Sequence, residues 1–309
     1  MTTEKSTLIT SNDPKGIQAT NLFHGVYNKL GLDEKRAQRL NENRESKFTE
    51  GLARLIMECS ATDLFANQVV VSNYTYPGEF QRKPEELQIK ILAEELKLDP
   101  RMALDYLRKI EGRPSVLPSG CHPQDGNIAI VSPFGLMQLI KGFKDPFDPE
   151  LYCQGLLRLF EIISKERSFT NYRNGQIDSE HLRQTVRTLE ACRMLANEQG
   201  ESPIWIISAQ LGFLHKGEST NRAREIFMPN EFGLGSVAGS SIAITHPERF
   251  VRNAELDMDL PGDEFSPDAD GSFSRCPRFI FNDSKLEFDT YDVSNAVDRF
   301  GSASAFLPQ

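Results

Sequence analysis

The chain has 309 residues, of which 39% are hydrophobic and 26% are charged, and this composition is typical of a globular protein that buries its own core. It contains no run of about 18 or more apolar residues, which argues against a membrane-spanning helix. The polar segment 1–15 lacks the apolar centre of a secretory signal, so we expect a cytoplasmic protein without a membrane partner.

The charge is unevenly distributed along the chain. The net charge of −9 divides into 13 acidic and 6 basic residues in 248–309, against 31 acidic and 29 basic residues in 1–247. Because phosphate contacts need lysine and arginine, this balance argues against nucleic-acid binding through the C-terminal region. It leaves the N-terminal region open to such binding.

The cysteines and histidines do not form a known metal or disulfide pattern. The five cysteines are an odd number, and none belongs to a Cys-x-x-Cys pair, which argues against a disulfide framework and a zinc knuckle. No two histidines have the spacing of a zinc hydrolase. Buried free thiols are the simpler interpretation of the cysteines.

The N-terminal part is predicted to be helical after a flexible leader, residues 1–19. Apolar residues between 22 and 30 have helical spacing, Gly31 is typical of a helix end, and a further helix is expected from about Glu34. The first half of that helix carries basic residues at Lys35, Arg36, Arg39 and Arg44. A solvated helix face explains them, and contact with nucleic acid through the helices around residues 36–54 is the alternative.

The remainder divides by pattern into two regions after the helical region 20–112. Residues 113–200 are expected to contain a loop followed by helices, with a strand-like run at 127–131. Residues 201–309 are expected to form an α+β region with an acidic loop and a C-terminal tail. Short β-like runs in this last region lie at 204–207, 241–245, 255–260, 278–281 and 286–291.

These patterns predict the α+β fold class. We expect a helical N-terminal two-thirds and a small mixed or antiparallel sheet in the C-terminal third, because strands that follow helices, without regular alternation, are typical of that class.

A glycine-rich segment is the first candidate ligand site. Gly233, Gly235 and Gly239, with Ser240, would allow backbone N–H groups to face an anion. A phosphate loop should open a helix, whereas 241–245 reads as a strand, so a tight turn or a close-packed helix of small residues is the alternative. Arg222 and Arg224 follow Ser219 at a predicted helix start and could also bind an anion, with an ordinary capped turn as the alternative.

Two acidic residues on a predicted strand are the second candidate site. Asp257 and Asp259 are separated by one residue, so both should point to one face of the strand, where they could share a divalent cation with Asp263. With Gly239-Ser240, they resemble the Gly-Ser plus Asp-x-Asp pattern of nucleotidyltransferases, although the gap is long and little chain follows. Acids on the solvent face of an edge strand are the alternative. His246 would act as a general base.

No complete catalytic constellation can be written from these residues. The sequence therefore favours a cytosolic, non-catalytic interaction or assembly protein with a protein partner or self-association. The first alternative is a metal-dependent phosphoryl- or nucleotidyl-transfer enzyme that uses Asp257, Asp259 and His246. The second is a nucleic-acid-associated protein that makes contact through its N-terminal helices.

Overall fold

The computed structural model describes residues 9–42, 47–61, 64–112, 116–253 and 255–308. The chain divides into two compact units, Met1–Leu52 and Ala53–Gln309. Residues 1–8 of the predicted leader and Arg44 of the predicted basic helix lie outside the described residues.

The first unit is helical, as the sequence predicts from residue 20 onward, but α1 begins at Pro14, so residues 14–19 of the predicted flexible leader 1–19 are helical. It contains α1 (Pro14–Leu30), α2 (Glu34–Glu42) and the start of α3 (Lys47–Ser60), which ends in the second unit. Pro14 at the first helical position fits the start of α1, and Gly31 ends it with φ 58°, a left-handed conformation that glycine adopts without strain. No residue of α1 or α2 is buried.

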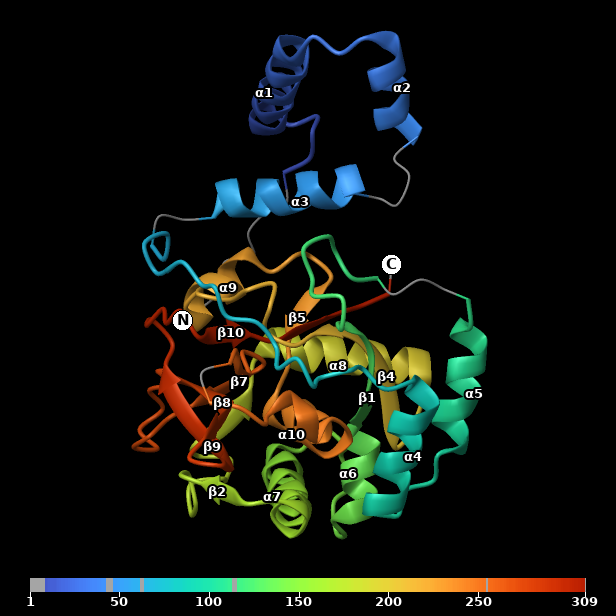
Figure 1. Cartoon of the computed structure of the whole chain (residues 1–309), viewed down its shortest axis with the longest axis vertical. Helices are drawn as coiled ribbons and strands as arrows, with labels where there is room; N and C mark the ends of the chain where they lie inside the picture. The colour runs from blue at the N-terminus through green and yellow to red at the C-terminus, as the bar shows by residue number, and fades with distance from the viewer. Residues whose placement is uncertain (1–8, 43–46, 62–63, 113–115, 254, 309) are drawn as a thin grey trace. The chain divides into compact units, whose positions relative to one another are not determined.

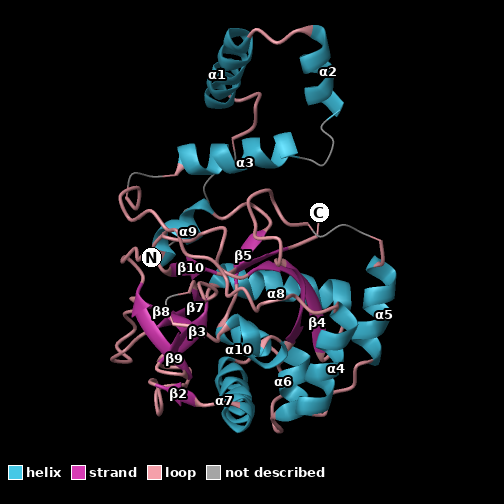
Figure 2. Cartoon of the chain, in the orientation of Figure 1, coloured by secondary structure: helices cyan, strands magenta, loops and turns pink. Residues whose placement is uncertain are grey.

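The second unit combines helices with strands from residue 126 onward (Figure 2). Its helices are α4 (Glu85–Leu96), α5 (Arg101–Ile110), α6 (Pro133–Leu139), α7 (Pro149–Glu166), α8 (Val186–Gln199), α9 (Thr220–Ile226) and α10 (Ser236–Thr245), followed by the 3₁₀ turn η2 (Pro247–Arg249). Its strands are β1 (Gly126–Val131), β2 (Phe169–Asn171), β3 (Leu182–Gln184), β4 (Ile204–Gln210), β5 (Glu231–Gly233), β6 (Asp257–Asp259), β7 (Asp263–Phe265), β8 (Arg275–Asn282), β9 (Lys285–Asp292), β10 (Phe300–Ser302) and β11 (Ser304–Phe306).

In the described residues, the strands form two sheets. The four-stranded sheet has the order β1-β4-β11-β5, and its pairs are antiparallel. The seven-stranded sheet has the order β10-β6-β8-β7-β3, with β9 beside β8 and β2 beside β9. The C-terminal segment joins the two sheets, because β10 belongs to the larger one and β11 to the smaller one (Figure 1).

The predicted α+β fold class, with one small sheet in the C-terminal third, is wrong. The structure is a mixed α/β arrangement in which β1, β2 and β3 lie among helices in the middle of the chain, and the C-terminal half contributes to two sheets rather than one small sheet. Residues 241–245 belong to the helix α10, not to a strand. Nearly every residue of α10 is buried, so its sequence is apolar on all sides and has no period that separates a helix from a strand.

The core of the second unit lies between the sheets and the central helices. Helix α10 contacts α7, β1 and α4. On the apolar face of the larger sheet, Phe279 and Phe288 pack against Phe160 of α7, with ring centroids 6.3 and 4.7 Å from it. All three rings are buried, and each aromatic side chain buries a large apolar area.

Two buried glutamine side chains form hydrogen bonds with backbone groups at strand edges in the smaller sheet. The Gln88 amide donates to the Asn127 carbonyl at 3.2 Å and accepts from the Ala129 N–H at 2.8 Å, so it pairs with the free edge of β1. Gln199 pairs in the same way with both backbone groups of Ile206 in β4, at 2.7 and 2.9 Å. These side chains supply hydrogen bonds that a neighbouring strand would otherwise supply.

Replacing Gln88 by methionine should lower the free energy of unfolding by about 1–3 kcal/mol, because two backbone groups of β1 would be buried without partners. Gln154→Met on the half-buried outer side of α7 is the matched control and should change it by less than about 0.5 kcal/mol. Chemical denaturation measures both variants. Equal effects of the two substitutions would contradict the role assigned to Gln88.

Candidate functional site

The glycine-rich segment opens a helix. β5 ends at Gly233, Gly235 is the residue before α10, and α10 begins at Ser236. This strand–loop–helix order is the one that phosphate-binding loops have, and the expectation that a strand follows the glycines is wrong. The question is therefore what the first N–H groups of α10 contact.

A buried carboxylate from the same chain occupies the start of α10. The Ser236 N–H donates to Asp263 Oδ2 at 2.6 Å, and the Val237 N–H donates to the Tyr152 hydroxyl at 3.3 Å. The Tyr152 hydroxyl in turn donates to Asp263 at 2.8 Å. A negative charge at a helix N-terminus is favourable, so Asp263 acts as an internal anion and caps the helix.

Burial determines the ionisation of this cap. Asp263 is fully buried, and burial raises its pKa to about 6, although the hydrogen bonds from Ser236 and Tyr152 oppose the shift. Burial also raises the pKa of Tyr152 well above its ordinary value. Near neutral pH, the site is therefore a tyrosine hydroxyl hydrogen-bonded to a carboxylate.

The glycines permit close backbone packing. A Cβ atom at Gly233 would lie 2.4 Å from the backbone N of Gly262, and one at Gly235 would lie 2.5 Å from the Tyr152 hydroxyl. A Cβ atom at Gly239 would lie 2.7 Å from the Leu260 side chain. All three distances are shorter than a carbon atom tolerates, so the packing of this loop against residues 260–263 accounts for the glycines.

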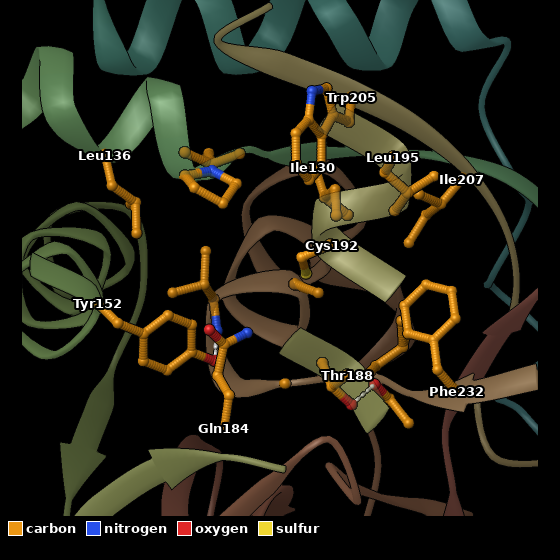
Figure 3. Close-up of a pocket in the computed structure, with 17 residues that line it drawn as sticks. Ile130, Leu136, Tyr152, Gln184, Thr188, Cys192, Leu195, Trp205, Ile207 and Phe232 are labelled. Carbon is orange, nitrogen blue, oxygen red and sulfur yellow. Dashed lines mark hydrogen bonds between the residues drawn. The ribbon is translucent and has the colours of Figure 1, made fainter. Parts of the chain in front are cut away.

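A small cavity of about 40 Å³ lies beside this loop, between the smaller sheet and the helices α6, α7, α8 and α10 (Figure 3). Most of its lining is apolar, including Ile130, Trp205 and Phe232. A cavity of this size can hold a few water-sized groups, whereas an engineered cavity that binds benzene measures about 150 Å³.

The polar groups at the cavity are hydrogen-bonded within the chain or are not reactive. The Thr188 hydroxyl donates to the Gly233 carbonyl at 3.0 Å (Figure 3). The Tyr152 hydroxyl belongs to the Asp263 cap. Burial raises the pKa of the Cys192 thiol to about 12, so it remains protonated and is a poor nucleophile. Nothing in this lining favours a catalytic reaction.

Asp257 and Asp259 lie on one face of β6, as a two-residue period requires. They are not on a solvent-exposed edge strand, because β6 lies between β10 and β8 and both carboxylates are buried. Burial raises the pKa of each to about 7, against the opposing charge of Arg278. The larger sheet therefore contains a buried pair of acids.

The predicted metal ligands are not gathered into one site. Asp263 points toward α10, whereas Asp257 and Asp259 share a face with Arg278. Among the residues that the structure describes, no group of three or more histidine, cysteine, aspartate or glutamate side chains could hold a metal ion. A metal would therefore have to rely on two carboxylates beside an arginine, which is a poor ligand set for a divalent cation.

His246 lies at the other end of α10 from the glycine loop. Its Nε2 accepts the Lys83 N–H at 3.0 Å, and its Nδ1 lies 2.8 Å from the Thr245 hydroxyl. Burial, together with the charges of Lys83 and Arg82, lowers the pKa of His246 to about 3. These partners do not include Asp257 or Asp259, so the structure does not bring the predicted base to the predicted acids.

The remaining predicted ligand residues have structural partners or lie in the core. Arg222 forms an ion pair with Glu225 at 3.1 Å. Arg224 donates to the carbonyls of Pro261 and Asp263 at 2.9 and 2.7 Å, and thus holds the backbone that carries the α10 cap. Ser240 is fully buried, and its hydroxyl has no hydrogen-bond partner among the residues that the structure describes.

One charged network was not predicted from the sequence. His215 lies between Glu218 and Glu231, at 2.9 and 2.8 Å, and Ser304 donates to Glu231 at 2.5 Å. Burial alone would lower the pKa of His215, but the two carboxylates raise it to about 10. The three-residue spacing of His215 and Glu218 is a weak signal, and the pairing with Glu231 exists only in the folded chain.

Comparison of the chain with protein families, with curated proteins and with solved structures finds no match. In the described part of the chain, no helix is both long enough and apolar enough to cross a membrane.

The Asp263→Ala variant should lower the free energy of unfolding by roughly 3 kcal/mol, because it leaves the Ser236 N–H and the Tyr152 hydroxyl buried without an acceptor. Asp148→Ala, which removes the half-buried cap of α7, is the matched control and should cost about 1 kcal/mol. Denaturant titration of both variants measures the difference. A cost at Asp263 no larger than that at Asp148 would contradict the assigned cap.

The stability of the protein should fall as the pH rises from about 5 to about 8. Burial raises the pKa values of Asp125 and Asp263 to about 6 and those of Asp257 and Asp259 to about 7, whereas an unfolded aspartate titrates near 3.9. The folded chain therefore binds more protons than the unfolded chain in this window, and raising the pH favours unfolding. His215, whose pKa is raised to about 10 by folding, adds to the fall above about pH 6.5. His246, which folding keeps neutral, opposes the trend only below about pH 6.5.

Thermal unfolding at the two pH values measures this dependence. The Asp257→Asn/Asp259→Asn variant should show a smaller fall in Tm, because it lacks two of the four carboxylates. A wild-type protein that is equally stable, or more stable, at the higher pH would show that these carboxylates are not buried as described.

Proposed function

We propose that this chain is a cytosolic, non-catalytic assembly protein whose N-terminal helix α1 binds a second copy of the same chain. The observation that carries the proposal is the exposed apolar surface of α1.

The apolar residues of α1 form a stripe along one side of the helix. Leu22, Val26 and Leu30 are spaced by four residues, and their exposed fractions are 74%, 59% and 61%. Phe23 and Tyr27 lie beside them and are 41% and 43% exposed. A stripe with this spacing normally packs against another apolar surface, and each large side chain that becomes buried contributes about 1.5–3 kcal/mol.

Helix α1 also needs a partner for its own stability. It has 17 residues, none of which is buried, and an isolated helix of this length is only marginally stable in water. Packing of an amphipathic face supplies most of the stability of such helices in proteins. A partner would therefore order α1 as well as bind it.

Charge favours a second copy as that partner. Residues 1–52 contain eight basic and seven acidic residues, whereas residues 53–309 contain 27 basic and 37 acidic residues. The slightly basic first unit of one copy is therefore complementary to the acidic second unit of another copy. Such complementarity accelerates association and orients the partners, while the apolar stripe provides the affinity.

The two alternative functions have weaker support. A metal-dependent transfer enzyme needs its carboxylates in one site, and Asp263 faces away from Asp257 and Asp259. Binding of nucleic acid would depend on Lys35, Arg36 and Arg39 of α2, but this helix also carries Glu34 and Glu42. A mixed helix surface of this kind is typical of solvent exposure.

Light scattering after size-exclusion chromatography tests the proposal. The wild-type protein should have a mass that is a multiple of the 34.9 kDa chain mass. Leu22→Gln/Val26→Gln should weaken self-association by roughly 100-fold, which corresponds to about 2.7 kcal/mol for two lost apolar contacts.

The control variant is Asn21→Gln/Asn28→Gln, which changes two polar side chains on another part of α1 and should leave the association unchanged. A wild-type protein that remains a 34.9 kDa monomer at high concentration would overturn the proposal. A mass that depends on added nucleic acid, and not on protein concentration, would also overturn it and would favour the basic residues of α2.

A further inference from the structure

The second face of the larger sheet carries a cluster of charged residues. β6 pairs with β8 so that Asp259 lies opposite Arg278, and β10 pairs with β6 so that Ser302 lies beside Asp259. Partners in register point to the same face of a sheet, so these three side chains project together. Arg278 is 8% exposed, Asp259 is 4% exposed and Ser302 is fully buried.

Neighbouring charges on this face already have partners. Asp289, which lies opposite Arg278 on β9, accepts a hydrogen bond from Arg173 at 2.9 Å. Glu287 lies 3.3 Å from Lys285, and Asp257 lies 3.2 Å from Arg299. Asp289 and Glu287 therefore have partners within the chain. Asp257 is only partly satisfied, because its Oδ2 is buried without a hydrogen bond among the described residues, and the charge of Arg278 acts on both Asp257 and Asp259.

Arg278 and Asp259 do not pair with each other, although they lie opposite in register. In the described part of the chain, Nε and Nη1 of Arg278, Oδ1 of Asp259 and the Ser302 hydroxyl are buried without a hydrogen-bond partner. A buried charged group without a hydrogen-bond partner is costly, and a bound water, ion or ligand is one explanation for its presence in a native structure. The unpaired atoms comprise donors on one side and an acceptor on the other.

Aromatic rings hold the guanidinium in place. The Arg278 carbon Cζ lies 4.3 Å from the centroid of the Phe300 ring and 4.6 Å from that of Tyr291. Stacking on both rings fixes the plane of the guanidinium and leaves its edge free to donate. The cluster borders solvent at the half-buried Tyr291 and at Arg299, whose side chain is 42% exposed.

We infer that this face binds a small zwitterion of the α-amino-acid class, whose carboxylate accepts hydrogen bonds from Arg278 and whose ammonium group donates to Asp259. A zwitterion brings one charge of each sign to the two unpaired groups, so neither remains buried without a partner. A simple anion would leave Asp259 unpaired and would be repelled by it. A simple cation would leave Arg278 unpaired and would be repelled by it in the same way. The inference is independent of the assembly proposed for α1.

Burial supports the choice of an ammonium group beside Asp259. The pKa of Asp259 is raised to about 7 because burial disfavours its charged form. A bound cation would stabilise the carboxylate and lower this pKa again. Binding should therefore release protons near neutral pH, which calorimetry in buffers of different ionisation enthalpy detects.

The test is a titration of the full-length protein with three probes, namely glycine, acetate and methylammonium. The Arg278 Nε–H resonance, assigned by its loss in Arg278→Lys, reports contact with the ligand. Glycine should shift this resonance and bind at least tenfold more tightly than acetate or methylammonium. Asp259→Asn should reduce glycine affinity at least tenfold and leave the weaker acetate binding unchanged or stronger.

Arg183→Lys is the matched control. Arg183 also stacks on an aromatic ring, 3.6 Å from the centroid of Phe273, but its Nε already donates to Glu264 at 2.9 Å. This variant should bind glycine like the wild type.

Two outcomes would overturn the inference. The first is no shift of the Arg278 resonance with any of the three probes, which would make the cluster a site for water alone. The second is acetate binding as tightly as glycine, which would make it a site for anions. Both titrations use the wild-type protein, and the Arg278→Lys variant serves only to assign the resonance.

Discussion

The buried carboxylate of Asp263 at the start of α10 is the interaction on which the second unit depends. It satisfies the first N–H of α10 and receives the Tyr152 hydroxyl of α7, while Arg224 of α9 holds the backbone around it. Three helices and the strand β7 therefore meet at one charged group. The approach is close enough that Gly233 and Gly235 cannot carry side chains, so the glycine-rich motif follows from this packing.

The two units use their side chains in opposite ways. In the second unit, polar groups are turned inward, as in the His215 network and the glutamines that complete the edges of β1 and β4. In the first unit, apolar residues of α1 are turned outward. The exposed apolar surface of α1 is the feature on which the proposed binding of a macromolecule rests.

The inferred ligand site differs from the predicted catalytic site in one decisive respect. The spacing of Asp257 and Asp259 correctly predicted that both face one side of a strand, but no pattern showed that Arg278 lies opposite Asp259. An arginine at that position changes the preferred ligand, because it repels a metal ion and attracts a carboxylate. Cross-strand register, which sets this pairing, depends on the whole sheet and not on local sequence.

The sequence alone determined the features that arise from local preferences. These include the helical N-terminal region, the end of α1 at Gly31, and the strands near 204–207, 278–281 and 286–291. Only the tertiary structure decided that 241–245 is helical, that the strands form two sheets and that Asp263 caps α10. The physical reason is that a segment buried on all sides has no polar face to reveal its period, and that a buried charge takes its partners from residues distant in sequence.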